Sequence, residues 1–567
     1  MTDAATEPDK ITGPTPDNAL RAADKADDGP VLAADGKPLK QSLNRALRAQ
    51  KLRALALIAP LLIFVLVSFI APIGDMLFRS VENQIVQETL PRTVNALQDY
   101  DAGSDVVPGD DVFEAAYYDV FYAAERKLHT RLGSRLNYEM TGASSLFRKS
   151  GRGVDDIGEV YLDQFEDLDE NWDEARPWAE LMGDPNWITA QDAWGGEDSG
   201  PMPTFELREG IADILPRTAA SYEIFANFMQ TEEEESPLEE EPWTVVHTAL
   251  YQDLRDGDVT GYTGPRADML QAADELVASP DFETIAFRDG FEEIDEDWVT
   301  PEIWQTIKTY SPAYTSGYFL NSVDMQKTAD GPALRDEDER IYGLLFQRTM
   351  FMSMVITISC ILLGYPIAYL LSNLPARKAN LLMILVLLPF WTSLLVRTSA
   401  WKVMLQQQGV INDVLVWLGM VADDARLTMI NNQFGTIVAM THILLPFMIL
   451  PMYSVMSTIP QSYVRAAKSL GATNWTTFWR VYFPQSVPGI GAGSILVFIL
   501  SIGYYITPEI VGGTSGIFIS NRIAYHISSS LNWGLAAALG SILLVVVLVL
   551  YWAYDRIVGI DNVKLGG

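Results

Sequence analysis

The sequence has 567 residues, of which 49% are hydrophobic and 20% charged, and its formal net charge is −33. This apolar content excludes a wholly disordered chain, and the single cysteine, Cys360, excludes a disulfide scaffold. The excess of 73 acidic over 40 basic residues argues against nucleic acid as a partner, because a polyanion repels such a chain.

The charge is unevenly distributed along the chain. Residues 79–340 hold 58 acidic and 19 basic residues, whereas the remainder holds 15 and 21. The sequence therefore predicts two regions of different composition, an acidic polar domain over residues 79–340 and an apolar remainder. Residues 1–50 are predicted to form a tail, disordered over residues 1–36, where Pro, Asp, Ala and Gly occur without an apolar period.

Six stretches without Asp, Glu, Lys or Arg have roughly the 20 residues that a helix needs to cross a ~30 Å bilayer core. Helices are the expected form, because lipid leaves backbone groups unsatisfied unless they bond within the segment. The first stretch lies within a predicted span over residues 51–78, and the other five lie within a predicted core over residues 341–556. The six are residues 54–74, 349–376, 379–396, 434–453, 487–508 and 533–554.

Lysine and arginine near the spans predict the orientation. Six basic residues and no acid lie between residue 37 and the first span, so the N-terminus is expected in the cytoplasm. The links after the second and fourth spans and the C-terminal tail, residues 557–567, then fall inside, and all three regions carry basic residues at or near the membrane. The acidic domain falls outside. Arg397 and Lys402, near the outer end of the third span, fit less well unless they snorkel.

The acidic domain is predicted to be mainly helical with long loops. Residues 265–279 have a helical period that places Met269, Leu270, Ala273, Leu276 and Val277 on one face, with Thr263 or Gly264 as the cap. Residues 111–136 are a second helical candidate.

The runs of glutamate at residues 232–235 and 239–241 have two interpretations. They are typical of a solvated acidic face, and they also suit a funnel that concentrates a cationic solute; we favour the solvated face. Asp253, Asp256 and Asp258 are close together but lack the twelve-residue loop of a calcium site, so no metal site is expected.

No catalytic motif is present. His129, His247, His442 and His526 are isolated from one another, and the HExxH, GxSxG and GxxxxGK[ST] motifs are absent. The chain is therefore not expected to be an enzyme or to hydrolyse ATP by itself. His442 and Cys360 are interpreted as packed residues of the helical bundle.

The loop at residues 457–486 predicts a helix-turn-helix at the membrane surface. Pro460 suits the first turn of a helix, Gly471 suits a left-handed helix end, and Thr473 or Asn474 suits the cap of a second short helix. Ala466 and Ala467 present a face of small side chains onto which another protein packs closely. An interfacial amphipathic hairpin is an equally good interpretation.

This loop resembles the EAA motif of permeases from binding-protein-dependent ABC importers, EAA-x3-G-x9-I-x-L-P. Two alanines, the glycine and Pro484 match at the expected spacing, while Arg465 stands where the family has Glu. The resemblance implies a coupling helix that docks onto a separate ATP-binding subunit. The residues assigned to this contact are Arg465, Ala466, Ala467, Gly471, Ala472, Phe478 and Pro484.

Residues 362–375, 387–401 and 503–513 resemble the spermidine/putrescine type of these permeases, and the resemblance covers residues 50–77 and 340–560. It implies an all-α integral membrane protein with the six transmembrane helices of the type I (MetI-like) fold, in a bacterial inner membrane. It also implies a second homologous permease, an extracytoplasmic solute-binding protein and alternating access. ATP and Mg²⁺ would bind the partner ATPase, and no cofactor would bind this chain.

A polyamine pathway needs carboxylates and aromatic faces. Trp391, Tyr504, Tyr505 and Glu509 are the pathway candidates, and Glu509 is the only acid between residues 427 and 550. Belt aromatics and a water-facing loop acid are the alternative interpretations. Other cargoes, such as thiamine, an organophosphonate or ferric ion, remain open, as does a membrane-anchored receptor or scaffold that acts through its acidic domain.

Overall fold

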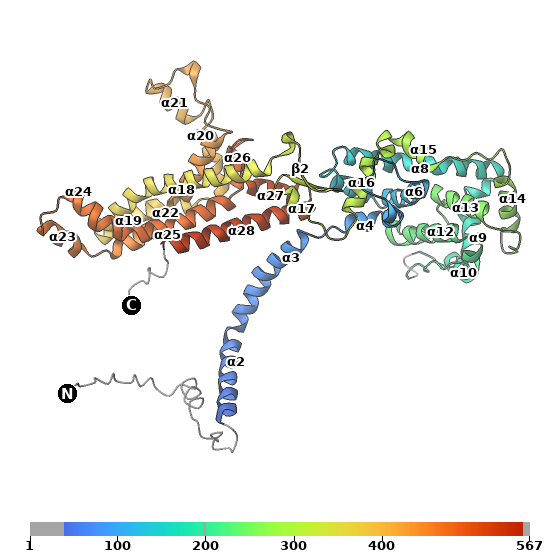
Figure 1. The fold of residues 1–567 in the computed structure, drawn as a ribbon, viewed down its shortest axis with the longest axis horizontal. Helices are drawn as coiled ribbons and strands as arrows, with labels where there is room; N and C mark the ends of the chain where they lie inside the picture. The colour runs from blue at the N-terminus through green and yellow to red at the C-terminus, as the bar shows by residue number, and fades with distance from the viewer. Residues whose placement is uncertain (1–38, 197–199, 559–567) are drawn as a thin grey trace. The chain divides into compact units, whose positions relative to one another are not determined.

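The computed structural model describes residues 39–196 and 200–558, and it is helical over most of this range (Figure 1). The predicted disorder of residues 1–36 lies outside the described residues, as does most of the C-terminal tail. The chain divides into two units, residues 1–78 and 79–567.

The first unit contains one long helix. It comprises α2 (Leu39–Val65), the π-helical turn η1 (Leu66–Ile70) and α3 (Ala71–Arg79). Within it, Gln50–Arg79 is long and apolar enough to cross a membrane. This confirms the first predicted span as a helix.

Residues 79–340 fold as a helical domain, here called the insertion, which confirms the predicted helical character. A two-stranded antiparallel sheet, β1 (Met325–Thr328) and β2 (Gly331–Leu334), lies near its end. Its α-helices are α4 (Ile85–Thr89), α5 (Pro91–Ala96), α6 (Asp110–Glu125), α7 (His129–Leu136), α8 (Ala143–Leu168), α9 (Ala175–Met182), α10 (Pro185–Asp192), α11 (Ile211–Ile214), α12 (Pro216–Phe228), α13 (Thr244–Asp256), α14 (Ala267–Val277), α15 (Phe287–Ile294), α16 (Pro301–Tyr310) and α17 (Gly317–Asn321).

Two details of the predicted helices were wrong. The candidate over residues 111–136 is broken between α6 and α7, where Lys127 has a positive φ of 57°. The cap of α14 is Arg266, also left-handed, and neither Thr263 nor Gly264. The predicted apolar face of α14 is confirmed, because Met269, Leu270 and Ala273 are buried in the core of the insertion.

The insertion contains a repeated arrangement that the sequence analysis missed. The tetrapeptide LPRT opens both α5 and α12. Thr93 donates from its backbone N and its Oγ1 to Asp119, at 2.7 and 2.8 Å, and Thr218 makes the same two bonds to Asp253, both at 2.8 Å. Burial raises the pKa of both carboxyls, to about 6 for Asp119.

A second sequence pattern also occurs twice, downstream of each LPRT tetrapeptide. The sequence Asp-Glu-x-Trp occurs at residues 169–172 and 295–298, and in each case another tryptophan follows six residues later. The later indole donates to the backbone oxygen of the earlier tryptophan, Trp178 to Trp172 at 2.6 Å and Trp304 to Trp298 at 2.8 Å.

The helices between these sites correspond in order. The series α5, α6, α8 and α9 matches α12, α13, α15 and α16, and α6 packs on α15 while α13 packs on α8. The insertion is therefore built from two copies of one helical motif packed reciprocally. A cleft of about 500 Å³ opens where they meet, flanked by the equivalent arginines Arg92 and Arg217.

The acidic residues of the insertion support the solvated-face interpretation. Glu232–Glu235 are exposed. The three aspartates weighed as a calcium site serve other partners: Asp253 binds Thr218, Asp256 pairs with Arg217 and Arg255, and Asp258 binds Thr260. Over residues 39–196 and 200–558, no group of three His, Cys, Asp or Glu could hold a metal ion.

The rest of the second unit, residues 341–558, is here called the core. Its elements are α18 (Tyr342–Asn373), α19 (Ala376–Leu387), η8 (Leu388–Trp391), α20 (Leu394–Met404), α21 (Val410–Trp417), α22 (Gln433–Thr458), α23 (Gln461–Ser469), α24 (Asn474–Thr477), η10 (Phe478–Tyr482), α25 (Phe483–Gly503), α26 (Ile506–Val511), α27 (Ile519–Ser528) and α28 (Trp533–Val558). Helices α18, α22 and α25 pack against one another along their lengths (Figure 1).

Glycines allow this close packing. A Cβ at Gly493 of α25 would lie 2.7 Å from Sδ of Met448 on α22, and one at Gly364 of α18 would lie 2.9 Å from Cε of Met452. The three helices therefore meet with little space between their backbones.

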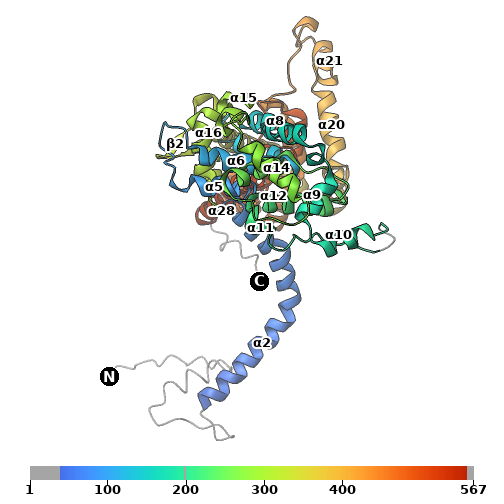
Figure 2. The same ribbon diagram turned by 90° about the vertical axis from the view of Figure 1, so that its right-hand side faces the viewer.

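The predicted third span is not one helix. The chain turns by 90° between residues 376–391 and 394–404, so the described residues contain five helices able to span a membrane, or six if this bent pair is counted as one span. Pro389 is the second residue of the short 3-10 turn η8 that precedes the break. Beyond it, α20 packs on α26 and α22, and α21 extends away from the other core helices (Figure 2).

The insertion is joined to the core by a set of specific contacts. Asp324 accepts hydrogen bonds from the backbone N of Ile341, Tyr342 and Gly343, which caps the start of α18. The ring of Tyr138 in the insertion packs edge-on against His526 of α27, with 5.7 Å between the ring centroids, and within the core the hydroxyl of Tyr342 lies 3.0 Å from Nε2 of the same histidine. Burial, and secondarily the nearby Arg522, lower the pKa of His526 to about 4, so this imidazole is neutral at pH 7.

Candidate coupling hairpin and translocation surface

Helix α23 and the turn that follows it form the predicted hairpin. Gly471 has a left-handed φ of 88°. The backbone N of Ala472 donates to the oxygen of Ala467 at 3.1 Å, and that of Gly471 donates to the oxygen of Lys468 at 3.0 Å. This pair of bonds is the Schellman motif, in which glycine is favoured because it has no Cβ. The left-handed role of Gly471 is confirmed.

The second half of the hairpin differs from the prediction. The side chain of Thr473 caps α24 by accepting from the backbone N of Thr476 at 3.2 Å. The helix then continues without a break through η10 into α25, so Asn474–Gly503 is one membrane-length helix. The predicted second short helix is therefore the first turns of this span. Pro484 is the second residue of α25 and directly follows the π-helical turn.

Aromatic rings join the hairpin to α18. Phe478 packs between Tyr365 and Tyr369, with ring centroids 6.1 and 5.9 Å away. Tyr482, buried one turn later, has its hydroxyl 3.0 Å from Oγ of Ser372. These contacts fix the second half of the hairpin to the end of α18.

The outer face of α23 is unoccupied by this chain. Ser462, Arg465, Ala466 and Ser469 are exposed on it, and Leu470 is 89% exposed at its end. Val464 and Ala467, on the opposite face, are half-buried. Small side chains on the exposed face allow a second protein to approach closely. Of the two alanines predicted to form this face, Ala466 lies on it and Ala467 does not.

Three of the four pathway candidates lie together. Tyr504 ends α25 and Tyr505 begins α26, one turn before Glu509. Asn521 of α27 donates to the backbone oxygen of Tyr505 at 2.9 Å and to Oε2 of Glu509 at 2.6 Å, and Ser520 donates to the backbone oxygen of Tyr504 at 2.8 Å. The carboxylate of Glu509 is held in place but stays exposed.

The fourth candidate is separate. Trp391 ends η8 and is 76% exposed. No contact between Trp391 and the other three candidates is found among the described residues. The sequence analysis also missed Asn521, because a lone polar residue in a short helix carries no motif; only the fold brings it to Glu509.

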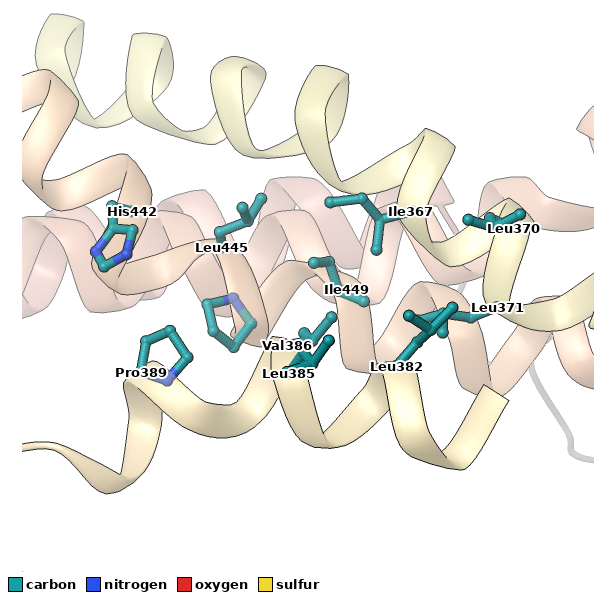
Figure 3. Close-up of a pocket in the computed structure, with 11 residues that line it drawn as sticks. Ile367, Leu370, Leu371, Leu382, Leu385, Val386, Pro389, His442, Leu445 and Ile449 are labelled. Carbon is teal, nitrogen blue, oxygen red and sulfur yellow. The ribbon is translucent and has the colours of Figure 1, made fainter. Parts of the chain in front are cut away.

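A cavity of about 310 Å³ lies between α18, α19 and α22 (Figure 3). Its lining is apolar except for His442, which lies at one end beside Pro389. None of the predicted pathway residues lines this cavity. Cys360 is buried with its Sγ 3.6 Å from the backbone oxygen of Thr441, which confirms its interpretation as a packed residue.

The family match described below falls within the core of this chain. The family described as binding-protein-dependent transport system inner membrane component matches residues 349–558. The spermidine/putrescine transport system permease protein PotB of Salmonella typhimurium (strain SL1344) is 33% identical over 220 residues, which cover 38% of this chain and 76% of PotB. PotB of Escherichia coli K12 is 32% identical over 220 residues, covering 38% and 79%.

A solved structure shows a weaker likeness. The crystal structure of a bacterial alginate ABC transporter, in complex with its alginate pentasaccharide-bound periplasmic protein, covers 40% of this chain and 81% of the matched chain. The sequence identity is 19% and the TM-score 0.33. Residues 79–340 lie outside the family match.

Proposed function

The chain belongs to the binding-protein-dependent transport system inner membrane components, the permeases of ABC importers, and from that premise we propose that it moves polyamines across the membrane. The observation that carries the choice of cargo is the 33% identity to PotB over 76% of that protein. Like its relatives, the chain is a transport subunit and not itself an enzyme.

The hairpin supports a coupling role in this proposal. Its exposed face has room for a separate ATP-binding subunit, and its aromatic contacts lead to α18. Closure of the ATP-binding subunits, with ATP and Mg²⁺ bound to them, would move the hairpin and rock α18 with it. Arg465, Ala466, Ala467, Gly471 and Ala472 form or flank the docking face.

The cluster around Glu509 supports a polyamine pathway. A protonated amine is stabilised by a carboxylate and by the faces of aromatic rings, and Glu509 with Tyr505 offers both at an exposed position. A second homologous permease would supply the other wall, and a solute-binding protein would deliver the cargo on the extracytoplasmic side, where we also place the insertion.

Uptake of labelled putrescine and spermidine tests the proposal, in cells with and without this chain. We expect uptake to depend on the chain and Glu509→Gln to reduce it at least tenfold. Asp413→Asn is the matched control, because it removes an exposed core acid that is paired with Arg426 at 2.7 Å. If polyamine uptake is the same without the chain while uptake of another solute is lost, the choice of cargo is wrong.

A further inference from the structure

Helix α20 carries a half-buried arginine, Arg397, in the membrane portion of the core. Nε and Nη1 of Arg397 have no contact with solvent and no hydrogen-bond partner among the described residues. Two of the three guanidinium nitrogens are therefore enclosed by this chain without being bonded to it.

A second polar group without a partner lies next to it. Nδ1 of His442 on α22 is also buried and unbonded among the described residues. Trp401, one turn after Arg397 on α20, packs edge-on against His442 at 5.4 Å between centroids. Arg397, Trp401 and His442 therefore share the face where α20 meets α22.

The position of Arg397 is fixed by its neighbour in sequence. Oγ1 of Thr398 lies 3.0 Å from Oγ1 of Thr507 on α26, and both side chains are buried. Rotation of α20 toward the lipid headgroups would break this bond. Charged residues inside membranes are usually paired, because an unpaired charge away from water is costly.

No ion pair joins Arg397 to an acid among the residues that the structure describes. Asp413 and Asp423 both pair with Arg426, at 2.7 and 2.8 Å, and Glu509 is held by a hydrogen bond from Asn521. The guanidinium is therefore free to pair with a carboxylate from outside this chain.

We infer that Arg397 and His442 form a binding site for a carboxylate of the companion permease subunit, which inserts beside α20 when the importer assembles. The inference rests on the proposed function, because a polyamine cargo is cationic and brings no anion to this site. Large apolar side chains flank Arg397 on α20 and are bare in this chain: Leu395 is 55% exposed and Val396 63% exposed. A helix of the companion subunit would cover them and deliver its carboxylate between them.

The test uses the importer purified as a complex from cells that express all its subunits. We expect Arg397→Gln to lower the amount of companion subunit retained per chain at least fivefold, and Arg397→Lys to restore part of it. Lys402→Gln, an exposed cation on the same helix, is the matched control and should change nothing. Arg397→Glu should lose the companion subunit, and reversal of one intramembrane acid of that subunit to Arg should restore it.

Three results would overturn the inference. Full retention of the companion subunit by Arg397→Gln would mean that water or the pathway satisfies the guanidinium. Failure of every acid-to-Arg reversal to rescue Arg397→Glu would exclude a paired carboxylate. Retention of the subunit with loss of uptake of an anionic solute would make Arg397 a cargo site and would refute the polyamine proposal as well. If the parent chain transports no polyamine but the charge reversal rescues assembly, only the proposed cargo fails.

Discussion

Replacement of Gly471 by valine should reduce the solute-stimulated ATP turnover of the assembled importer. A Cβ at this position meets nothing within 4 Å, so the cost arises from the backbone alone, whose φ is 88°. An L-residue in the left-handed region costs roughly 1–2 kcal/mol, and β-branched residues suffer most. That penalty corresponds to about a 5- to 30-fold shift away from the native hairpin.

The assay is ATP hydrolysis by the assembled importer in nanodiscs, with and without the solute-loaded binding protein. Gly471→Val should reduce the stimulated rate several-fold, and Gly471→Asn should lose much less, because asparagine tolerates the left-handed region. Membrane insertion should be unaffected in both variants.

Gly419 provides a matched control with the same backbone geometry. Its φ is 69°, its Cβ position is also open, and Gly419 and Met420 make the same pair of Schellman bonds to Val416 and Leu415 at the end of α21. Gly419→Val therefore carries the same strain in a different loop and should leave stimulated turnover intact. Equal losses in both valine variants, or no loss in Gly471→Val, would refute the coupling role of the hairpin.

Three further predictions follow from the packing. The pKa of His526 is near 6.5 in the unfolded state and about 4 in the folded state, so acidification protonates the unfolded state first. The free energy of unfolding should therefore fall between pH 6.5 and 4, by at most about 3 kcal/mol. Thermal unfolding of the His526→Gln variant should lack this pH dependence. Thr93→Val and Thr218→Val should each cost about 1–2 kcal/mol, with nearly equal shifts in the urea midpoint if the two copies are equivalent; a large inequality would contradict that equivalence. Phe478→Ala should cost about 2 kcal/mol and increase proteolysis of the hairpin, and unchanged cleavage would show that the aromatic contacts with α18 do not fix it.

The sequence predicted the membrane helices well, because a run of about twenty apolar residues is typical of a membrane-spanning helix and of few other structures. It failed at the third span: composition reports that residues 379–396 are apolar but not that the chain turns by 90° after η8. Gly471 was found because its left-handed conformation has a local cause. The bond from Asn521 to Glu509 was not found, because it depends on how α26 and α27 pack.

The duplication in the insertion was readable from the sequence and was missed. The LPRT tetrapeptide and the Asp-Glu-x-Trp sequence each occur twice, and comparison of the chain with itself would have paired them. Net charge and helical periodicity do not detect a repeat whose copies differ in loop length. The reciprocal packing of α6 on α15 and of α13 on α8 has no counterpart in local sequence.

The insertion is attached to the ends of two membrane helices, α18 and α28, so its orientation depends on the tilt of both. Asp324 holds the first turn of α18, and the ring of Tyr318 lies where a Cβ at Gly534 of α28 would approach it to 2.4 Å. A tilt of either helix during the transport cycle would therefore move the whole insertion of 262 residues. A pair of fluorophores, one on the insertion and one in the plane of the bilayer, would report this movement as a change in the distance between them, without a label in the permeation path.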